Sequence, residues 1–131
     1  MSKCYCGRSQ SYDTCCGRIH TDITLVTTAE DLMRSRYSAF VLAKGEYLMK
    51  SHHSTTRPPL KEKKSIVKWA NSVKWVKLEV LKTSKGAESD EEGTVEFKAF
   101  YFENGALEVI HENSQFVKEN GYWVYMGEVD H

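Results

Sequence analysis

Hydrophobic residues in the first half of the chain recur every three or four positions, which is the spacing of one face of a helix. The stripe consists of Met33, Tyr37, Phe40, Val41 and Leu48. Thr27 and Glu30 stand three positions apart just before it, so they predict a capping box at the start of a helix. Gly45 is expected to interrupt that helix, because glycine is a poor helix former.

A loop and a second helix are predicted before residue 73. The loop runs from Ser51 to Pro59, because Pro58 and Pro59 end any helix there. A shorter, basic helix is predicted from Leu60 to about Asn71.

From Val73 onward the pattern changes to the alternation of half-buried strands. Four strands are predicted, at residues 73–83, 94–103, 106–118 and 122–129. The pairs Asn104-Gly105 and Asn120-Gly121 lie between strand-like runs and are strong signals for two-residue hairpin turns. Helices followed by an antiparallel meander predict an α+β fold, with the N-terminal helices packed on a curved antiparallel sheet.

Two-residue turns would also set the register of the last three strands. They place Phe97 opposite Glu112, Val95 opposite Ser114, Phe116 opposite Tyr125 and Lys118 opposite Trp123. The same face carries Ala99, Tyr101, Glu108 and Ile110. The other face carries Phe100, Phe102, Leu107, Val109, His111, Val117, Val124 and Met126. Both faces hold large apolar groups, so alternation leaves open which of them is the inner one.

Composition and charge are those of an ordinary globular domain. The chain has 131 residues, of which 40% are hydrophobic and 27% are charged, enough for one domain with its own core. It has no long apolar run and no signal-peptide pattern, so the sequence predicts no membrane span and a reducing, cytoplasmic location. Its 18 Lys and Arg balance 18 Asp and Glu, and this neutrality argues against nucleic acid as a partner.

The four cysteines lie within thirteen residues, at Cys4, Cys6, Cys15 and Cys16. Cysteines that are adjacent or one apart are poor disulfide partners, whereas two such pairs can supply the four corners of a structural Zn²⁺ site. Zinc is favoured in a reducing compartment. Two disulfides, such as Cys4–Cys15 with Cys6–Cys16, and redox-active thiols are the alternatives. The backbone is expected to need positive φ at Gly7 and Gly17, and His20 is near enough in sequence to shield the site.

The spacing of these residues resembles a known motif. Cys4-Tyr5-Cys6-Gly7, then Tyr12, then Cys15-Cys16-Gly17 look like the SEC-C motif. This zinc-binding module is named after the C-terminus of the bacterial protein-translocation motor, where it binds the translocation chaperone. The resemblance implies zinc binding. Contacts made by a basic surface do not carry over, because the usual basic residues are replaced by Gln10, Ser11, Asp13 and Thr14.

The rest of the chain resembles the YchJ-type family of uncharacterised bacterial proteins. The similarity lies in LMRSRYSAF (32–40), YLMKSHHSTTR (47–57), WVKLEVLKTSKG (75–86), GTVEFKAFY (93–101) and HENSQFVKENGYWVYMG (111–127). It implies a SEC-C-type zinc knuckle at residues 1–20 and a nuclear transport factor 2-like, cystatin-like cone at residues 27–131. The family implies this fold and no established activity.

The family's recurrent motifs point to candidate pocket residues: Arg34, Arg36, Tyr37, His53, Arg57, Glu112 and Ser114. His53 and Glu112 are the best acid–base pair if the loop folds over the mouth of the sheet. An ordinary loop histidine is the alternative for His53. Glu112 on an aromatic face needs a partner, because a buried unpaired carboxylate is costly. Arg34, Arg36 or Arg57 is expected to form that ion pair, or Arg57 to anchor a small anion.

Three functions are consistent with the sequence. The favoured one is a non-enzymatic adaptor, in which a zinc knuckle on a cone domain binds a protein partner. The second is a small-molecule binder or enzyme, which requires a cavity of at least a few hundred Å³ lined by His53, Arg57, Glu112 and Ser114. The third is nucleic-acid or ribosome association, for which basic residues near the knuckle and the stretch KWANSVKWVK give weak support. Apolar groups on both sheet faces also allow a homodimer through the outer face.

Overall fold

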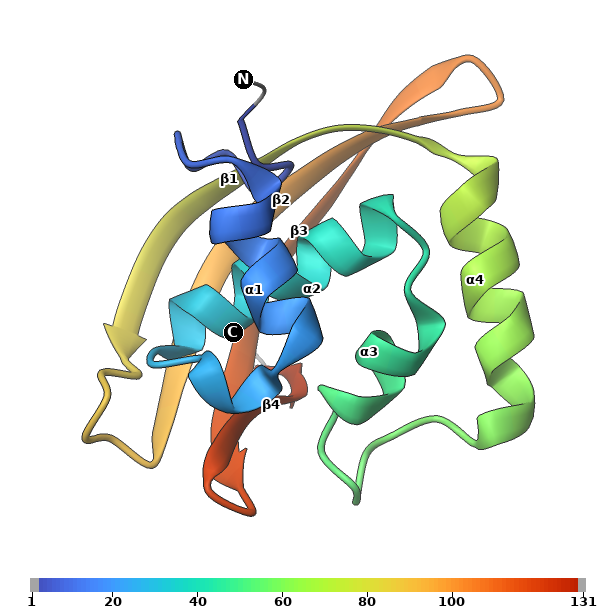
Figure 1. Ribbon diagram of the computed structural model, residues 1–131. Coiled ribbons are helices and arrows are strands. Elements are labelled where there is room, and N and C mark those ends of the chain that lie inside the picture. Colours follow the sequence, from blue (N-terminus) through green and yellow to red (C-terminus); the bar gives the residue numbers. More distant parts are fainter. Residues whose placement is uncertain (1–2, 130–131) are drawn as a thin grey trace.

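The computed structural model describes residues 3–129 (Figure 1). Short helical pieces come first: η1 (Tyr12–Thr14), α1 (Cys16–Thr21) and η2 (Ile23–Leu25). They are followed by α2 (Ala29–Val41), α3 (Gly45–Lys50), η3 (Leu60–Glu62) and α4 (Lys63–Ser72). Four strands come last: β1 (Lys74–Lys85), β2 (Glu92–Glu103), β3 (Ala106–Glu119) and β4 (Tyr122–Glu128). The predicted α+β class is confirmed.

The strands form one antiparallel meander in the order β1-β2-β3-β4, as predicted. Both Asn-Gly pairs form tight turns, with φ of 54° and 80° at Asn104-Gly105 and of 55° and 85° at Asn120-Gly121. Two successive positive φ angles suit the twist of paired strands. The turns therefore set the register, and all four predicted pairs are observed: Phe97–Glu112, Val95–Ser114, Phe116–Tyr125 and Lys118–Trp123.

Helix packing decides which face of the sheet is the inner one. Helix α2 contacts β1, β2 and β4, and Figure 1 shows α1, α2 and α3 on one side of the sheet with α4 beside them. The covered face carries Val95, Phe97, Phe116 and Trp123, each at most 8% exposed. Together with the fully buried Leu32 of α2, these side chains belong to the main hydrophobic core.

The start of one helix differs from the prediction, whereas the break predicted at Gly45 is observed. Thr28, rather than Thr27, is the N-cap of α2, because its hydroxyl oxygen accepts a hydrogen bond from the Asp31 backbone N–H at 3.1 Å. Helix α2 ends before Gly45, and Gly45 begins α3. A β-carbon on Gly45 would lie 2.6 Å from Val67 Cγ2, so glycine is needed for the close approach of α3 and α4. None of the helices between residues 3 and 129 has both the length and the hydropathy that crossing a bilayer needs.

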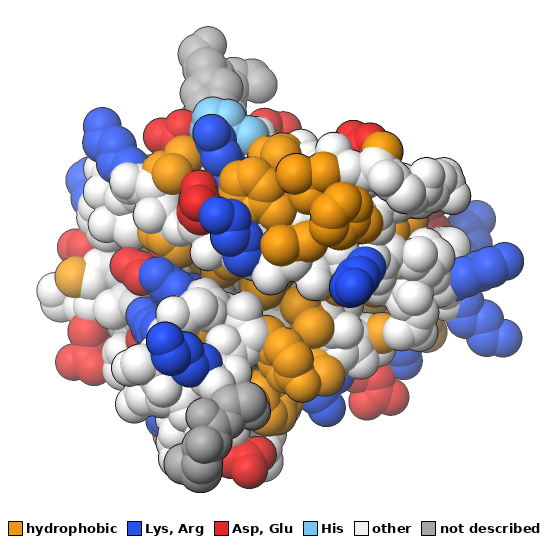
Figure 2. All heavy atoms as spheres, turned by 90° about the horizontal axis from the view of Figure 1, so that it is seen from above, with side chains coloured by type: hydrophobic (Ala, Val, Ile, Leu, Met, Phe, Trp, Pro, Cys, Tyr) orange, Lys and Arg blue, Asp and Glu red, His pale blue; other side chains and the backbone are white. Residues whose placement is uncertain are grey.

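The opposite face of the sheet leaves large apolar side chains in contact with solvent. Phe102, Leu107 and Val109 are 41–54% exposed and together form the outer apolar patch. Apolar side chains also gather on the surface in the view from above (Figure 2). The outer face of the sheet is therefore available for contact with another molecule.

Candidate metal centre and internal cavity

The four cysteine side chains converge in the knuckle, which comprises the described residues 3–20. Their Sγ atoms all lie within 4.8 Å of one another, and Cys6 Sγ lies 3.7 Å from Cys15 Sγ. Sulfur atoms bound about 2.3 Å from a tetrahedral Zn²⁺ stand about 3.8 Å apart, so the observed spacing fits such an ion. All four cysteines are buried, and none forms a disulfide. The residues therefore suit a tetrahedral metal ion.

Two glycines let the chain close around the sulfur atoms, for different reasons. Gly7 has a φ of +96°, as predicted, and its N–H donates to the Cys4 carbonyl oxygen at 3.2 Å. Gly17 lies in α1 and does not have positive φ, so that prediction is wrong. A β-carbon on Gly17 would stand 2.7 Å from Tyr12 Cε2. Gly17 is therefore required by space, and Gly7 by backbone conformation.

Hydrogen bonding and burial shift the pKa values of three of the thiols in different directions. A hydrogen bond with the Cys16 thiol lowers the pKa of Cys6 to about 5. Burial raises the pKa of Cys15 to about 11. The hydrogen bond to Cys6, followed by burial, raises the pKa of Cys16 as well. Cys6 therefore loses its proton before Cys15 and Cys16, and metal binding would displace the protons of those two thiols.

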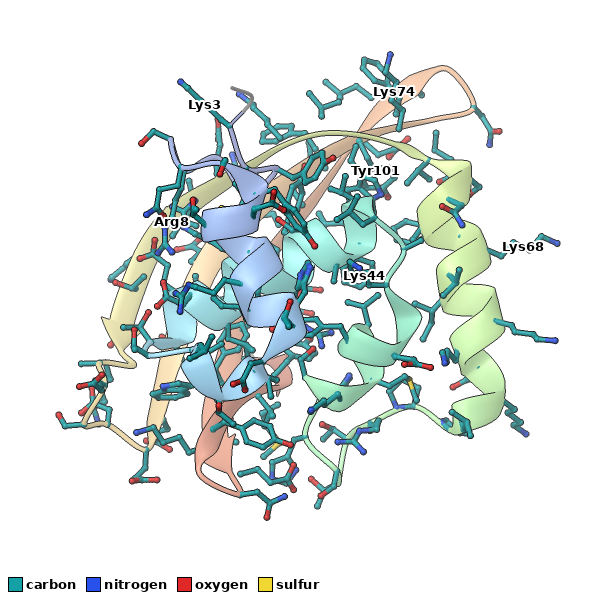
Figure 3. The ribbon with its side chains drawn as sticks, in the orientation of Figure 1. Lys3, Arg8, Lys44, Lys68, Lys74 and Tyr101 are labelled. Carbon is teal, nitrogen blue, oxygen red and sulfur yellow. The ribbon has the colours of Figure 1, made fainter. Side chains whose placement is uncertain are left out.

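Charged side chains attach the knuckle to α2. Arg34 Nη1 donates to the Cys6 carbonyl oxygen at 2.7 Å, and Arg34 Nε pairs with Glu30 at 2.9 Å. From the knuckle, Arg8 pairs with Asp31 at 2.7 Å and lies 3.6 Å from Glu30. We call these contacts the docking seam. Both of these acidic partners of Arg8 (labelled in Figure 3) belong to α2.

Tyr12 and His20 form a second link between the knuckle and α2. Tyr12 packs against the cysteine cluster, and its hydroxyl oxygen lies 2.7 Å from His20 Nδ1. His20 Nε2 lies 2.7 Å from the Ser35 carbonyl oxygen. A carbonyl can only accept, so in the neutral ring Nε2 carries the proton and Nδ1 accepts from Tyr12. Burial lowers the pKa of His20 and favours this neutral form. Tyr12 therefore connects His20 to the cysteine cluster, by a hydrogen bond on one side and packing on the other.

A separate cavity of about 180 Å³ lies among α2, α4 and the inner face of the sheet. Its walls are mostly apolar and aromatic. Four candidate pocket residues line it: Arg36, Tyr37, Glu112 and Ser114. The volume is below the few hundred Å³ expected of an enzyme pocket, so this cavity has room only for a small ligand.

The other three candidate residues lie elsewhere. Arg34 belongs to the docking seam. His53 Nε2 lies 3.5 Å from Glu119, and Arg57 donates two hydrogen bonds to the His52 carbonyl oxygen, at 3.0 and 2.8 Å. The structure therefore does not bring His53 to the cavity that Glu112 lines. No local sequence pattern pointed to Glu119, because its contact with this loop is long-range.

Arg36 and Glu112 face the same cavity without forming an ion pair. Arg36 Nη1 donates to the Leu48 carbonyl oxygen at 2.9 Å and to the Ser51 hydroxyl at 2.6 Å. Glu112 accepts a hydrogen bond from the Ser114 hydroxyl at 3.1 Å. Among the described residues, no carboxylate oxygen lies within 4.0 Å of the Arg36 guanidinium. Burial lowers the pKa of Arg36 to about 10 and raises the pKa of Glu112. The expected ion pair of Glu112 with a candidate arginine is not observed.

Aromatic side chains surround one end of the cavity. Trp69 of α4 and Trp75 of β1 line it together with Phe40, and the two indole centroids are 5.5 Å apart. The Tyr101 ring lies 5.4 Å from Trp75, and Figure 3 shows Tyr101 between the sheet and α4. Both tryptophans of the stretch KWANSVKWVK are half-buried in this cluster. The sequence pattern identified these rings, but it did not assign them to a cavity wall.

Sequence comparison places the chain among known bacterial proteins. A family model described as YchJ, middle NTF2-like domain, matches residues 28–127. A UPF0225 protein of Streptomyces coelicolor is 43% identical over 122 residues, which cover 93% of this chain and 90% of that protein. A UPF0225 protein of Vibrio parahaemolyticus is 40% identical over 125 residues, which cover 95% of this chain and 73% of that protein.

Two solved structures share the fold. The solution structure of a SEC-C motif containing protein from Rhodopseudomonas palustris has a TM-score of 0.83 and 32% identity, covering 98% of this chain and 100% of that one. The crystal structure of a SEC-C motif containing protein from Psychrobacter arcticus has a TM-score of 0.80 and 30% identity, covering 100% and 85%. This chain therefore belongs to the YchJ family, and it carries a SEC-C-type cluster of four cysteines before that family's NTF2-like domain.

Proposed function

We propose that this protein is a non-enzymatic adaptor, whose knuckle is folded by one structural Zn²⁺ ion and binds a protein partner. The closed cysteine cluster carries the proposal. Its four members are at most 4% exposed and would supply all four corners of a tetrahedral site. A site of this kind has no open position for substrate or water, so it serves folding rather than catalysis. Thiolate ligands in this geometry favour zinc over harder cations.

The same chemistry gives the expected compartment. Zinc binding needs reduced thiols, which persist in the cytoplasm and are oxidised in exported proteins. The four free cysteines support this assignment. We therefore propose a cytoplasmic location.

The surface of the knuckle supports a protein partner. Tyr5 is 47% exposed, and its ring packs edge-on against Tyr12 with centroids 5.8 Å apart. Exposed aromatic side chains on a firm support are frequent anchors of protein interfaces. Arg8 is engaged by Glu30 and Asp31, so it offers little free positive charge to a nucleic acid. We therefore propose a protein rather than a nucleic acid.

Metal and thiol analysis tests the metal centre. Protein purified under reducing conditions without added metal is expected to contain one zinc ion per chain. Its four thiols should react with a thiol reagent only after chelation or denaturation. Cys6→Ser should lose the ion, and Ser9→Ala, in the neighbouring turn, should keep it. Freely reactive thiols in the purified protein would contradict the proposal.

Partner capture tests the adaptor role. Tagged, zinc-loaded protein is expected to retain a partner from a bacterial lysate, and Tyr5→Ser should lose it. Lys68→Ala is the matched control, because Lys68 projects from α4 away from the knuckle (Figure 3). The captured partner is then purified and titrated. Equal affinity for zinc-loaded and zinc-free protein would show that the knuckle is not the binding surface.

We also propose that a second copy of this chain covers the outer apolar patch. Phe102, Leu107 and Val109 form an exposed apolar surface on paired strands, and burial of such a surface favours association. Light scattering after size exclusion is expected to show a dimer that Leu107→Glu dissociates. Wild-type protein that stays monomeric at high concentration would rule out this dimer.

A further inference from the structure

The cavity of the NTF2-like domain has a charged end and an aromatic end. Arg36 and Glu112 carry the charges, and the Arg36 guanidinium lies over the Tyr125 ring with Cζ 4.8 Å from its centroid. Trp69, Trp75 and Phe40 supply the rings of the other end, which has no charged side chain among the described residues that line it. These residues have no part in the metal centre or in the proposed adaptor surface. The cavity is therefore a second, independent candidate site.

The sheet register keeps the two ends apart. Glu112 pairs with Phe97 on β2, whereas Trp75 pairs with Tyr101, four residues farther along the same strand. Four strand residues span about 13 Å. A ligand that reaches both ends therefore needs a polar head and an apolar ring.

Arg36 has hydrogen-bonding capacity that the protein does not use. Only its Nη1 donates to other groups among residues 3–129, namely to the Leu48 carbonyl oxygen and the Ser51 hydroxyl. No fully buried side-chain nitrogen or oxygen in that range lacks a partner, so Nε and Nη2 border space that water can reach. The space that Arg36 lines is this cavity. A guanidinium with free N–H groups is suited to pair with a carboxylate.

Glu112 supplies the opposite charge at the same end. One of its carboxylate oxygens accepts a hydrogen bond from Ser114, and the carboxylate is more than 4.0 Å from Arg36. An anionic ligand would meet attraction from Arg36 and repulsion from Glu112, whereas a cationic ligand would meet the reverse. Only a ligand with both charges is attracted by both residues.

The volume limits the ligand to a single ring. A dry cavity of about 150 Å³ holds benzene, and this one measures about 180 Å³. Arg36, Glu112, Trp69 and Trp75 are half-buried, so a head group held between Arg36 and Glu112 can remain partly hydrated. Nucleotides and other larger ligands need about 300 Å³ or more.

We propose that this cavity binds a single-ring aromatic α-amino acid in its zwitterionic form. The carboxylate of the ligand pairs with Arg36, its ammonium group pairs with Glu112, and its ring packs against Trp69 and Trp75. The recognition is by charge and shape, and it involves no reaction.

Four related compounds test the proposal with the full, zinc-loaded protein. L-phenylalanine is expected to bind saturably, with a Kd of about 1 mM or tighter. 3-Phenylpropionate lacks the ammonium group, phenethylamine lacks the carboxylate, and L-alanine lacks the ring. Each of these should bind at least about 10-fold more weakly. Equal binding of 3-phenylpropionate and L-phenylalanine, or no saturable binding of L-phenylalanine, would overturn the proposal.

NMR of the tryptophan side chains locates the binding. The indole N–H signals of Trp69 and Trp75 should shift with L-phenylalanine. Trp123 is the internal control, because it is 1% exposed, does not line the cavity and donates its indole N–H to the Thr27 carbonyl oxygen at 3.2 Å. Shifts confined to Trp123, or spread equally over all three, would contradict binding in the cavity.

Two variants distinguish charge recognition from general apolar binding. Glu112→Gln keeps the shape of the side chain, and it should weaken L-phenylalanine about 10-fold while strengthening 3-phenylpropionate. Arg36→Met should weaken L-phenylalanine and strengthen phenethylamine. Glu108→Gln is the matched control, because Glu108 is exposed on the same strand and outside the cavity. If Arg36→Met fails to fold, the opposite responses of the two ligands to Glu112→Gln still decide the question.

Discussion

The knuckle and the NTF2-like domain are stabilised in different ways. In the domain, side chains from α2, α3 and all four strands form one large apolar cluster. In the knuckle, the four cysteines form a cluster of their own, with Tyr12 packed against it. A segment of about twenty residues cannot bury enough apolar surface to fold alone. Among the described knuckle residues 3–20, only Ile19 joins the main apolar core. The proposed metal ion and the polar contacts with α2 are therefore expected to hold the rest of the knuckle in place.

The largest difference between the two regions is expected when the metal is removed. Structural zinc in small peptides contributes about 10–16 kcal/mol at neutral pH, so chelation under reducing conditions is expected to unfold residues 3–20 and leave the sheet folded. Amide NMR spectra before and after chelation, and after zinc is restored, measure this. A metal-free, reduced sample with an unchanged N-terminal spectrum would show that the knuckle does not depend on metal.

Truncation of a side chain in the apolar core should destabilise the NTF2-like domain and leave the zinc content unchanged. Phe116 is 1% exposed on the inner face, so Phe116→Ala is expected to cost about 3–5 kcal/mol of the free energy of unfolding. Phe102→Ala, on the outer face, is the control, and in protein dilute enough to be monomeric it should cost less than about 1 kcal/mol. Urea denaturation measures both, and zinc content below the transition should stay unchanged. Similar losses for the two variants would contradict the assignment of the inner face.

The docking seam is where the two regions depend on each other. Arg34→Met removes the donor to the Cys6 carbonyl oxygen and the partner of Glu30, so it should weaken docking by about 1–3 kcal/mol. Zinc transfer to a chromogenic chelator should accelerate, with the unfolding midpoint of the sheet nearly unchanged. Arg18→Met, at an exposed position of the knuckle, is the control. Equal rates for the two variants would mean that the seam does not hold the knuckle.

A smaller effect of pH is expected on the stability of the NTF2-like domain. Burial, followed by the charges of Arg36, Arg57 and His53, lowers the pKa of His52 from 6.5 to about 4. The unfolded chain therefore takes up a proton before the folded protein does, and stability should fall as pH decreases from 6.5 to 4. The half-exposed ring limits this loss to about 1–2 kcal/mol.

Comparison of wild type with a His52 variant and with a control variant separates the effect of His52 from the loss of zinc in acid. The stability of wild type is measured by urea denaturation from pH 7 to 4 beside His52→Asn. The variant should lose less stability on acidification, because it lacks the titrating ring. His111→Asn is the control, since His111 is exposed on the outer face of the sheet. Parallel curves for wild type and His52→Asn would exclude this contribution.

The parts of the fold that local chemistry determines were predictable from the sequence. The two Asn-Gly turns and the alternation of strand residues were sufficient for the four strands and for every predicted register pair. The start of α2 was missed by one residue because Thr27 and Thr28 are both good caps, each followed three residues later by an acidic side chain. The prediction of positive φ at Gly17 was wrong, because this position needs glycine for packing and not for backbone conformation. Its neighbour Tyr12 closes on it only in the folded knuckle.

The candidate site was predictable in the knuckle and less so in the domain. Four cysteines at this spacing already suggest a metal site, because a tetrahedral ion needs four such ligands. The partner of each charged side chain cannot be predicted from the spacing of residues in the sequence. Arg34 and Arg36 are two residues apart, yet one attaches the knuckle and the other faces a cavity. His53 lies near Glu119 rather than Glu112.

By itself, the sequence determined the candidate metal ligands, the helix-then-sheet order and the register of the hairpins, since each depends on residues close together in the chain. Tertiary structure decided which face of the sheet is covered, how the knuckle is attached, and which charges remain unpaired. These depend on contacts between segments far apart in the chain. The spacing of apolar residues along a strand or a helix predicts that one face is apolar, but the tertiary packing decides which element covers that face.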